Sequence, residues 1–95
     1  MISLSTHVLD TGAGAPARGV EVEVRRGDDV VAHERTDAEG RARLAEDLEP
    51  GRYRIAWLPP SPFFRRVELE VELEDGHYHV PLLVSPYGCA SYRGS

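Results

Sequence analysis

The chain has 95 residues, enough for one domain with a single core. Sixteen acidic and eleven basic residues give a net charge of −5, which argues against a nucleic-acid partner, because phosphate binding needs a basic face. All eleven basic residues are arginine, which excludes a lysine Schiff base or a lysine general base.

Short segments of alternating apolar and polar residues, separated by Gly, Pro and Asp, predict β-strands along the whole chain. In the first segment, "ISLSTHVL" (2–9), the alternation puts Ser3, Ser5 and His7 together on the polar face. The later segments are "VEVEVR" (20–25), "VVAHERT" (30–36), "RARLAE" (41–46), "RYRIAWL" (52–58), "RVELEVELE" (66–74), "HYHVPLLVSP" (77–86) and "GCASYRGS" (88–95).

These seven or eight strands, with no helical period between them, predict an all-β fold, an antiparallel sandwich of two sheets. One side of each sheet would face water or another subunit. Pro81 interrupts the penultimate strand and lacks a ladder donor, so we expect it at an edge or a bulge. The segment "PPSP" (59–62) is expected to stop any regular element.

The remaining composition favours a cytoplasmic protein. No apolar run approaches the roughly 20 residues that span a bilayer, and the first ten residues lack signal-peptide order. The single cysteine, Cys89, cannot form an internal disulfide, which is compatible with a reducing compartment.

Four histidines are the natural acid–base candidates, because only histidine titrates near neutrality without much help from its surroundings. His7 lies on a polar strand face, where plain solvent exposure is the simpler interpretation. His77 and His79 lie two apart on one strand, so their side chains share a face about 7 Å apart. His33 lies in an edge-like strand and is expected to be structural or exposed.

His77 and His79 could begin a zinc site, with His7 or Cys89 as a third ligand. The sequence has no CxxC or HExxH pattern that requires one, so we predict no metal and no cofactor. Cys89 by itself is expected to be an inert packing residue.

Arg41 begins a strand directly after the tight turn "DAEG" (37–40). From that position a guanidinium can project into a cleft and hold a planar, oxygen-rich ligand with two hydrogen bonds. The simpler alternative is a surface arginine beside Asp37 or Glu39. Serine nucleophiles are not expected, since neither Ser85 nor Ser91 has a G-x-S-x-G setting.

Three separated blocks together resemble one family. "STHVLDTGAGAPARGVEVEV" (5–24), "TDAEGR" (36–41) and "HYHVPLLVSPYG" followed by "SYRGS" (77–95) are similar to the 5-hydroxyisourate hydrolases, the transthyretin-like enzymes of urate degradation. The resemblance covers nearly the whole chain in the family's order, and the final Tyr-Arg-Gly-Ser is its most specific part.

The resemblance implies a single transthyretin-like domain over residues 1–95 that assembles as a homotetramer, a dimer of dimers with its sites in a central channel. It also implies hydrolysis of 5-hydroxyisourate to 2-oxo-4-hydroxy-4-carboxy-5-ureidoimidazoline, with no cofactor, nucleic acid or membrane involved. The family's catalytic positions fall on His7, Arg41 and His79. Its substrate-binding tetrapeptide, a wall of the pocket, falls on the last four residues, Tyr92, Arg93, Gly94 and Ser95.

The chain departs from the family pattern in two places. Only "LPPSPFF" (58–64) remains where the family carries a longer stretch with a short helix, so we expect a trimmed surface and an altered assembly edge. Cys89 replaces the usual aromatic residue and Ala90 a common serine, which would alter packing along the interface.

The chemistry needs water to attack an activated ring amide and a proton to reach the departing nitrogen. His7 and His79 would divide this acid–base work, in an order that the sequence leaves open, and Arg41 would hold the carbonyl oxygens. The rival interpretations are a non-catalytic transthyretin-like carrier of a small ligand and a structural or adhesive sandwich domain.

Overall fold

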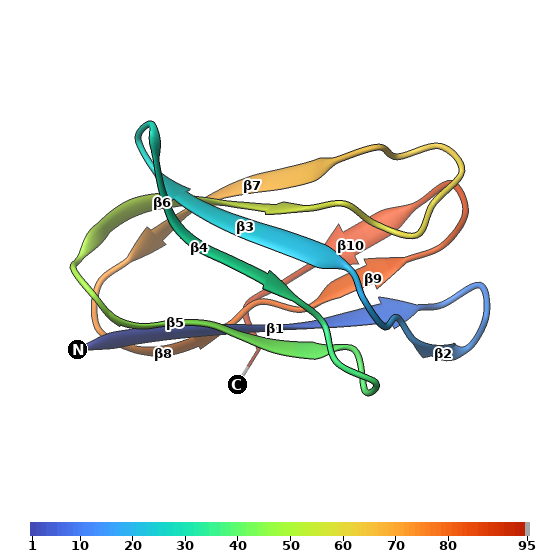
Figure 1. Cartoon of the computed structure of the whole chain (residues 1–95), viewed down its shortest axis with the longest axis horizontal. Coiled ribbons are helices and arrows are strands. Elements are labelled where there is room, and N and C mark those ends of the chain that lie inside the picture. Colours follow the sequence, from blue (N-terminus) through green and yellow to red (C-terminus); the bar gives the residue numbers. More distant parts are fainter. Residues whose placement is uncertain (95) are drawn as a thin grey trace.

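The computed structural model describes residues 1–94, which form ten β-strands in two sheets packed face to face (Figure 1). In chain order the strands are β1 (Ile2–Asp10), β2 (Ala15–Pro16), β3 (Glu21–Arg26), β4 (Asp29–Arg35), β5 (Arg41–Leu48), β6 (Gly51–Trp57), β7 (Val67–Leu73), β8 (Gly76–His79), β9 (Leu82–Val84) and β10 (Cys89–Ser91).

Strand β1 is the centre of the six-stranded sheet. Its first half lies between β5, which is antiparallel to it, and β8, which is parallel. Its second half lies between β2 and β9, and β10 extends the sheet beyond β9. The four-stranded sheet has the order β4-β3-β6-β7 and is antiparallel throughout.

The predicted two-sheet, all-β sandwich is confirmed, but two pairings differ from the expected antiparallel order. Both β8 and β9 run parallel to β1. The reason is that β7 belongs to the other sheet. The turn before Gly76 therefore carries the chain across the sandwich, and β8 does not pair with β7 as an antiparallel hairpin. Alternation along a strand fixes its faces and leaves the direction of its neighbours open.

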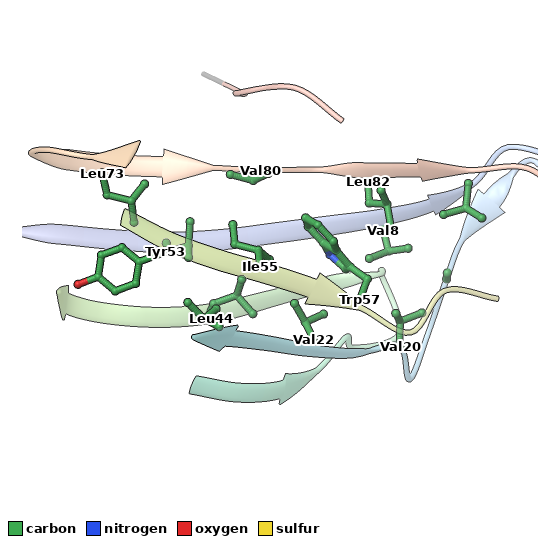
Figure 2. Close-up of a cluster of buried hydrophobic side chains, with 14 of the residues drawn as sticks. Val8, Val20, Val22, Leu44, Tyr53, Ile55, Trp57, Leu73, Val80 and Leu82 are labelled. Carbon is green, nitrogen blue, oxygen red and sulfur yellow. The ribbon is translucent and has the colours of Figure 1, made fainter. Parts of the chain in front are cut away.

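The core lies between the sheets and follows the predicted alternation. Every second residue of β1, from Ile2 to Val8, is at most 1% exposed. From the four-stranded sheet, Tyr53, Ile55 and Trp57 of β6 point into the same space, as Figure 2 shows. Burying one such side chain contributes about 1.5–3 kcal/mol, so these faces fix the register of both sheets.

A buried polar contact joins the sheets behind the outward face of β1. The indole Nε1–H of Trp57 donates to Thr6 Oγ1 over 3.1 Å, and the Thr6 hydroxyl donates to the carbonyl of Val80 over 2.7 Å. Thr6 is 1% exposed, so an unpaired hydroxyl there would be costly. The contact ties β1 to the chain segment between β8 and β9.

Two irregular segments match their sequence signals. Pro81 is buried between β8 and β9 and separates them into two short strands that each pair with β1. The connection 58–66 contains no strand or helix and docks through Ser61, whose hydroxyl donates to the carbonyl of Pro86 over 2.9 Å. Residues 1–94 contain no helix with the length and apolar character needed to cross a membrane.

Candidate active site

The outward side of β1 and its two neighbours gathers the polar residues that the sequence singled out. Because alternate residues of a strand point to opposite sides, burial of Ile2, Leu4, Thr6 and Val8 turns their neighbours outward. Strands β5 and β8 flank this half of β1 on either side. We call the resulting surface the histidine face; its members are Ser3, Ser5, His7, Arg41, His77 and His79.

Strand register sets the positions of the three predicted catalytic residues. His7 of β1 lies directly opposite Arg41 of β5. Ser5, two residues earlier on the same side of β1, lies opposite His79 of β8. Residues 7, 41 and 79 are thus brought together on one sheet surface.

The tight turn before Arg41 is built by Asp37. Its carboxylate accepts the backbone N–H groups of Glu39, over 2.8 Å, and of Arg41, over 3.0 Å. These two hydrogen bonds, with the positive charges of Arg41 and His7, hold the pKa of the Asp37 carboxyl below its usual value. Gly40 completes the turn at a φ of 77°, where an added Cβ would lie 2.4 Å from the carbonyl oxygen of Val8.

The guanidinium of Arg41 keeps its donors available. Among residues 1–94 it forms no ion pair, because Asp37 is engaged by the backbone of its own turn. Arg41 is exposed beside Asp37, as the simpler alternative expected, but the two side chains form no ion pair. Its fork of N–H donors suits a planar, oxygen-rich group.

His7 is held by the same turn. Its ring Nε2 lies 2.8 Å from the backbone carbonyl of Glu39. A carbonyl can only accept, so Nε2 carries the proton and neutral His7 has its lone pair on Nδ1. The turn therefore fixes the tautomer of His7 and the position of Arg41 together.

His79 is half-buried, and its Nδ1 lies 2.8 Å from Ser5 Oγ. Burial lowers the pKa of the His79 imidazole, and the nearby positive charges of His7, His77 and Arg41 lower it further. The ring is therefore held toward its neutral form near neutral pH. Among residues 1–94 its Nε2 has no hydrogen-bond partner, so that nitrogen is open to a ligand or water.

The segment after β10 closes against His79. The N–H of Gly94 donates to the His79 carbonyl over 2.6 Å, and the two residues form an isolated antiparallel bridge. A Cβ on Gly94 would lie 2.8 Å from Cδ2 of the His79 ring, so the close approach requires glycine. Ser95, the last of the predicted substrate-binding residues, lies outside the described residues.

Tyr92 and Arg93 are not brought against the three predicted catalytic residues within this chain. The Arg93 guanidinium stacks 4.1 Å over the ring of Tyr78, which points to the side of β8 opposite His79. Tyr92 is 59% exposed. Both line a separate hollow of about 410 Å³ between β7 and the C-terminal segment.

The other candidates lie apart from the histidine face. His33 is exposed on the four-stranded sheet and pairs with Glu21 over 3.1 Å. Cys89 is exposed on β10. The hydroxyls of Ser85 and Ser91 donate to backbone carbonyls. No group of three or more His, Cys, Asp or Glu residues in the 1–94 range is arranged to hold a metal ion.

The sequence interpretation gave Ser3 and Ser5 no part in the site. Ser5 contacts both His79 and His77, and His77 also contacts Ser3 Oγ over 2.7 Å. A signal was present, because Ser3 and Ser5 alternate in phase with His7 and had to share its face. Only the pairing of β1 with β8 shows that this face meets the two histidines.

The histidine face therefore combines an imidazole held toward its neutral form, a second imidazole with a fixed tautomer, and a guanidinium that forms no ion pair among residues 1–94. Such a surface can activate a water molecule and stabilise negative charge that develops on a nearby oxygen. Its positive character also attracts an oxygen-rich ligand although the whole chain has a net charge of −5.

Comparison with known proteins agrees with this chemistry. Residues 4–94 match the family described as "Transthyretin: HIUase/Transthyretin family". The 5-hydroxyisourate hydrolase of Caulobacter vibrioides is 46% identical over the whole of both chains. That of Pseudomonas aeruginosa is 35% identical over 97% of this chain and 90% of its own.

Solved structures give the same relationship. The 5-hydroxyisourate hydrolase of Klebsiella pneumoniae superposes with a TM-score of 0.91 at 35% identity, over the whole of both chains. Sea bream transthyretin in complex with thyroxine superposes with a TM-score of 0.84 at 25% identity, over 96% of this chain and 93% of its own.

Proposed function

Because the chain belongs to the HIUase/transthyretin family, we propose that His7, Arg41 and His79 are the catalytic residues of its hydrolase reaction. The chain is a 5-hydroxyisourate hydrolase of urate degradation. The observation that carries the site proposal is the double register on β1, which sets His7 opposite Arg41 and Ser5 opposite His79.

In the proposed mechanism, His79 is the general base. Its neutral ring takes a proton at Nε2 from a water molecule while that water attacks the ring amide carbonyl of 5-hydroxyisourate. The lowered pKa of His79 keeps the base form populated near neutral pH. A positioned acid–base group of this kind contributes roughly 10² to 10⁴-fold in rate.

Arg41 and His7 act on the other atoms of the same carbonyl. Arg41 donates hydrogen bonds to the oxygen that becomes negative as the tetrahedral intermediate forms, which is worth about 3 kcal/mol of barrier. His7, whose Nε2–H is committed to Glu39, accepts a hydrogen bond at Nδ1 and so orients the attacking water, and the proton that His79 took from water passes from His79 Nε2 to the departing nitrogen. The hydroxyl group of the attacking water remains on the carbonyl carbon and becomes part of the product carboxylate.

The alternative of a non-catalytic carrier is not favoured. The chain is 46% and 35% identical to two hydrolases and 25% identical to the thyroxine-bound transthyretin, although both kinds share the fold. A non-catalytic carrier also needs no neutral imidazole base beside a guanidinium that forms no ion pair among residues 1–94.

The proposal includes a homotetramer, a dimer of dimers, in which the histidine faces of two subunits enclose the site. The histidine face, which is open in a single chain, would then be covered by the second subunit. Tyr92, Arg93, Gly94 and Ser95 are proposed to bind substrate; the support is that Gly94 already pairs with His79. The exposed free thiol of Cys89 fits the cytoplasm as the proposed compartment.

The test generates 5-hydroxyisourate in situ from urate with a urate oxidase and follows its ultraviolet absorbance. The native protein should accelerate the decay above the spontaneous rate, and a folded His7→Ala variant should lose most of that acceleration. Full activity in the variant contradicts the role of His7. A native protein that leaves the spontaneous rate unchanged contradicts the function.

A further inference from the structure

Four side chains on the histidine face form one continuous line of hydrogen-bonding contacts. Ser3 Oγ lies 2.7 Å from His77 Nδ1, His77 Nε2 lies 3.1 Å from Ser5 Oγ, and Ser5 Oγ lies 2.8 Å from His79 Nδ1. The line alternates between β1 and β8, because the parallel register sets Ser3 beside His77 and Ser5 beside His79. It ends at the proposed general base.

The hydrogen bonds along this line can all be donated in either of two directions. A serine hydroxyl has one proton, and a neutral imidazole has one N–H and one lone pair. If His79 donates from Nδ1 to Ser5, then Ser5 donates to His77 Nε2, and His77 Nδ1–H donates to Ser3. This direction leaves the lone pair of His79 on Nε2, the atom that faces away from Ser5.

We propose that Ser5 and His77 are a proton relay that fixes the base tautomer of His79 and carries its positive charge away during the reaction. Both residues would act through His79, so they are positioning residues for the proposed hydrolysis. The inference rests on the proposed function for its kinetic consequences, whereas the resting tautomer is a property of the folded chain alone.

The relay balances as a set of three proton transfers. As an O–H bond of water breaks, an N–H bond forms at His79 Nε2. The Nδ1–H of His79 breaks as a new O–H forms on Ser5, and the original O–H of Ser5 breaks as an N–H forms at His77 Nε2. His77 becomes imidazolium, and the reverse sequence returns the proton through His79 Nε2 to the departing nitrogen.

Local charge and burial favour moving the proton in this way. His79 is half-buried and faces His7 on β1, Arg41 on β5 and His77 on β8, while Gly94 beside it carries no side-chain charge. A positive charge on His79 is disfavoured there by burial first and by these groups next. The ring of His77 is exposed, so water can solvate the charge once it arrives.

The first test compares Ser5→Ala with Ser5→Thr. Loss of the hydroxyl breaks the relay at its midpoint and should lower kcat by about 10 to 10²-fold with little change in KM, the lower part of the range for positioned acid–base groups. Ser5→Thr keeps a hydroxyl at the same position and should recover most of kcat. Equal kcat for native and Ser5→Ala proteins would overturn the relay.

The second test separates positioning from charge transfer. Asparagine at position 77 can still hydrogen-bond to Ser5 but cannot hold the proton, so His77→Asn should lower kcat by about tenfold, within the range for proton-transfer groups. The matched control is His33→Asn, an exposed histidine on the opposite sheet, which should keep native kcat and KM. Native kcat in His77→Asn would overturn the charge-transfer step.

The third test does not depend on activity. Nitrogen-15 NMR of the imidazole rings should show neutral His79 protonated at Nδ1 in the native protein, and a mixture of tautomers in folded Ser5→Ala. Native His79 protonated at Nε2 would overturn the relay even if hydrolysis is normal. If instead the native protein does not hydrolyse 5-hydroxyisourate, the proposed function fails while the tautomer measurement still decides the relay structure.

Discussion

The outward faces of the two sheets are both polar, yet they are built in opposite ways. On the four-stranded sheet, glutamates and arginines meet as ion pairs, both along one strand and between neighbouring strands. We call this surface the ion-pair face; its pairs include Arg25–Glu23, Arg66–Glu23, Arg66–Glu68, Arg54–Glu68 and Arg52–Glu72. On the histidine face, Arg41 and the three imidazoles lie together with serine hydroxyls and no carboxylate bound to their side chains among residues 1–94.

The difference shows what makes a polar strand face reactive. On the ion-pair face each charge is compensated, and arginines hold the pKa values of Glu23 and Glu68 below their ordinary values. On the histidine face Arg41 and the three imidazoles form no ion pair among residues 1–94, and burial together with the positive charges of His7, His77 and Arg41 lowers the pKa of His79. Holding like charges close together in this way is a cost to folding that is typical of functional sites.

A large effect is expected from removing the free guanidinium. Arg41→Gln should lower kcat by about 10² to 10³-fold, the loss typical for one donor to a developing oxyanion. The matched control is Arg52→Gln on the ion-pair face, which should keep native kcat because that arginine is paired with glutamates. Comparable losses of kcat in the two variants would contradict the proposal that only the histidine face takes part in the reaction.

A smaller effect is expected where the C-terminal segment closes on His79. An alanine at position 94 places a Cβ 2.8 Å from the His79 ring and forces the ring or the segment to move. Because displacements near 1 Å can cost about 10²-fold, Gly94→Ala should lower kcat by up to that factor. Gly88→Ala, at another glycine outside the positive-φ region and away from the histidine face, controls for the loss of a glycine.

The pH dependence of stability is the next effect in size. The pKa of folded His79 lies below the ordinary value of 6.5, so the unfolded chain binds more protons between the two values. Stability contributed by neutral His79 is therefore lost as the pH falls through 6.5 toward the folded pKa, and the loss levels off below it. In a His79→Asn variant the Tm should fall less steeply over this interval; an unchanged slope contradicts the lowered pKa.

The smallest effect is expected on the ion-pair face itself. Glu68→Gln removes the partner of Arg66 and Arg54, all of which are exposed to solvent that screens the pairs. The variant should keep the native kcat, and its Tm should stay close to the native value. A clear Tm loss in Glu68→Gln would mean that the ion-pair face stabilises the fold more than its exposure allows.

Much of the molecule could be predicted from local pattern. Alternation along "ISLSTHVL" assigned the buried and outward residues of β1, and Pro81 marked the break between β8 and β9. These features depend on the two-residue period of a strand and on a missing N–H, which act within a few residues.

The remaining features depend on which distant strands become neighbours. Ser5 meets His77 and His79 across 72 and 74 residues of sequence, and only because β8 crosses to the first sheet and runs parallel to β1. The approach of Gly94 to the His79 ring likewise follows from tertiary packing. The family resemblance identified the three catalytic candidates, whereas their supporting contacts needed the fold.

The central claim is that the chemistry takes place on the histidine face, with His79 as the base. The most direct measurement is the ratio of the 5-hydroxyisourate decay rates supported by His79→Ala and by His33→Ala, two folded variants that each lose one imidazole. We expect His33→Ala to match the native protein and His79→Ala to be slower by about 10² to 10⁴-fold, the contribution of a positioned general base. Equal rates for the two variants would contradict the account.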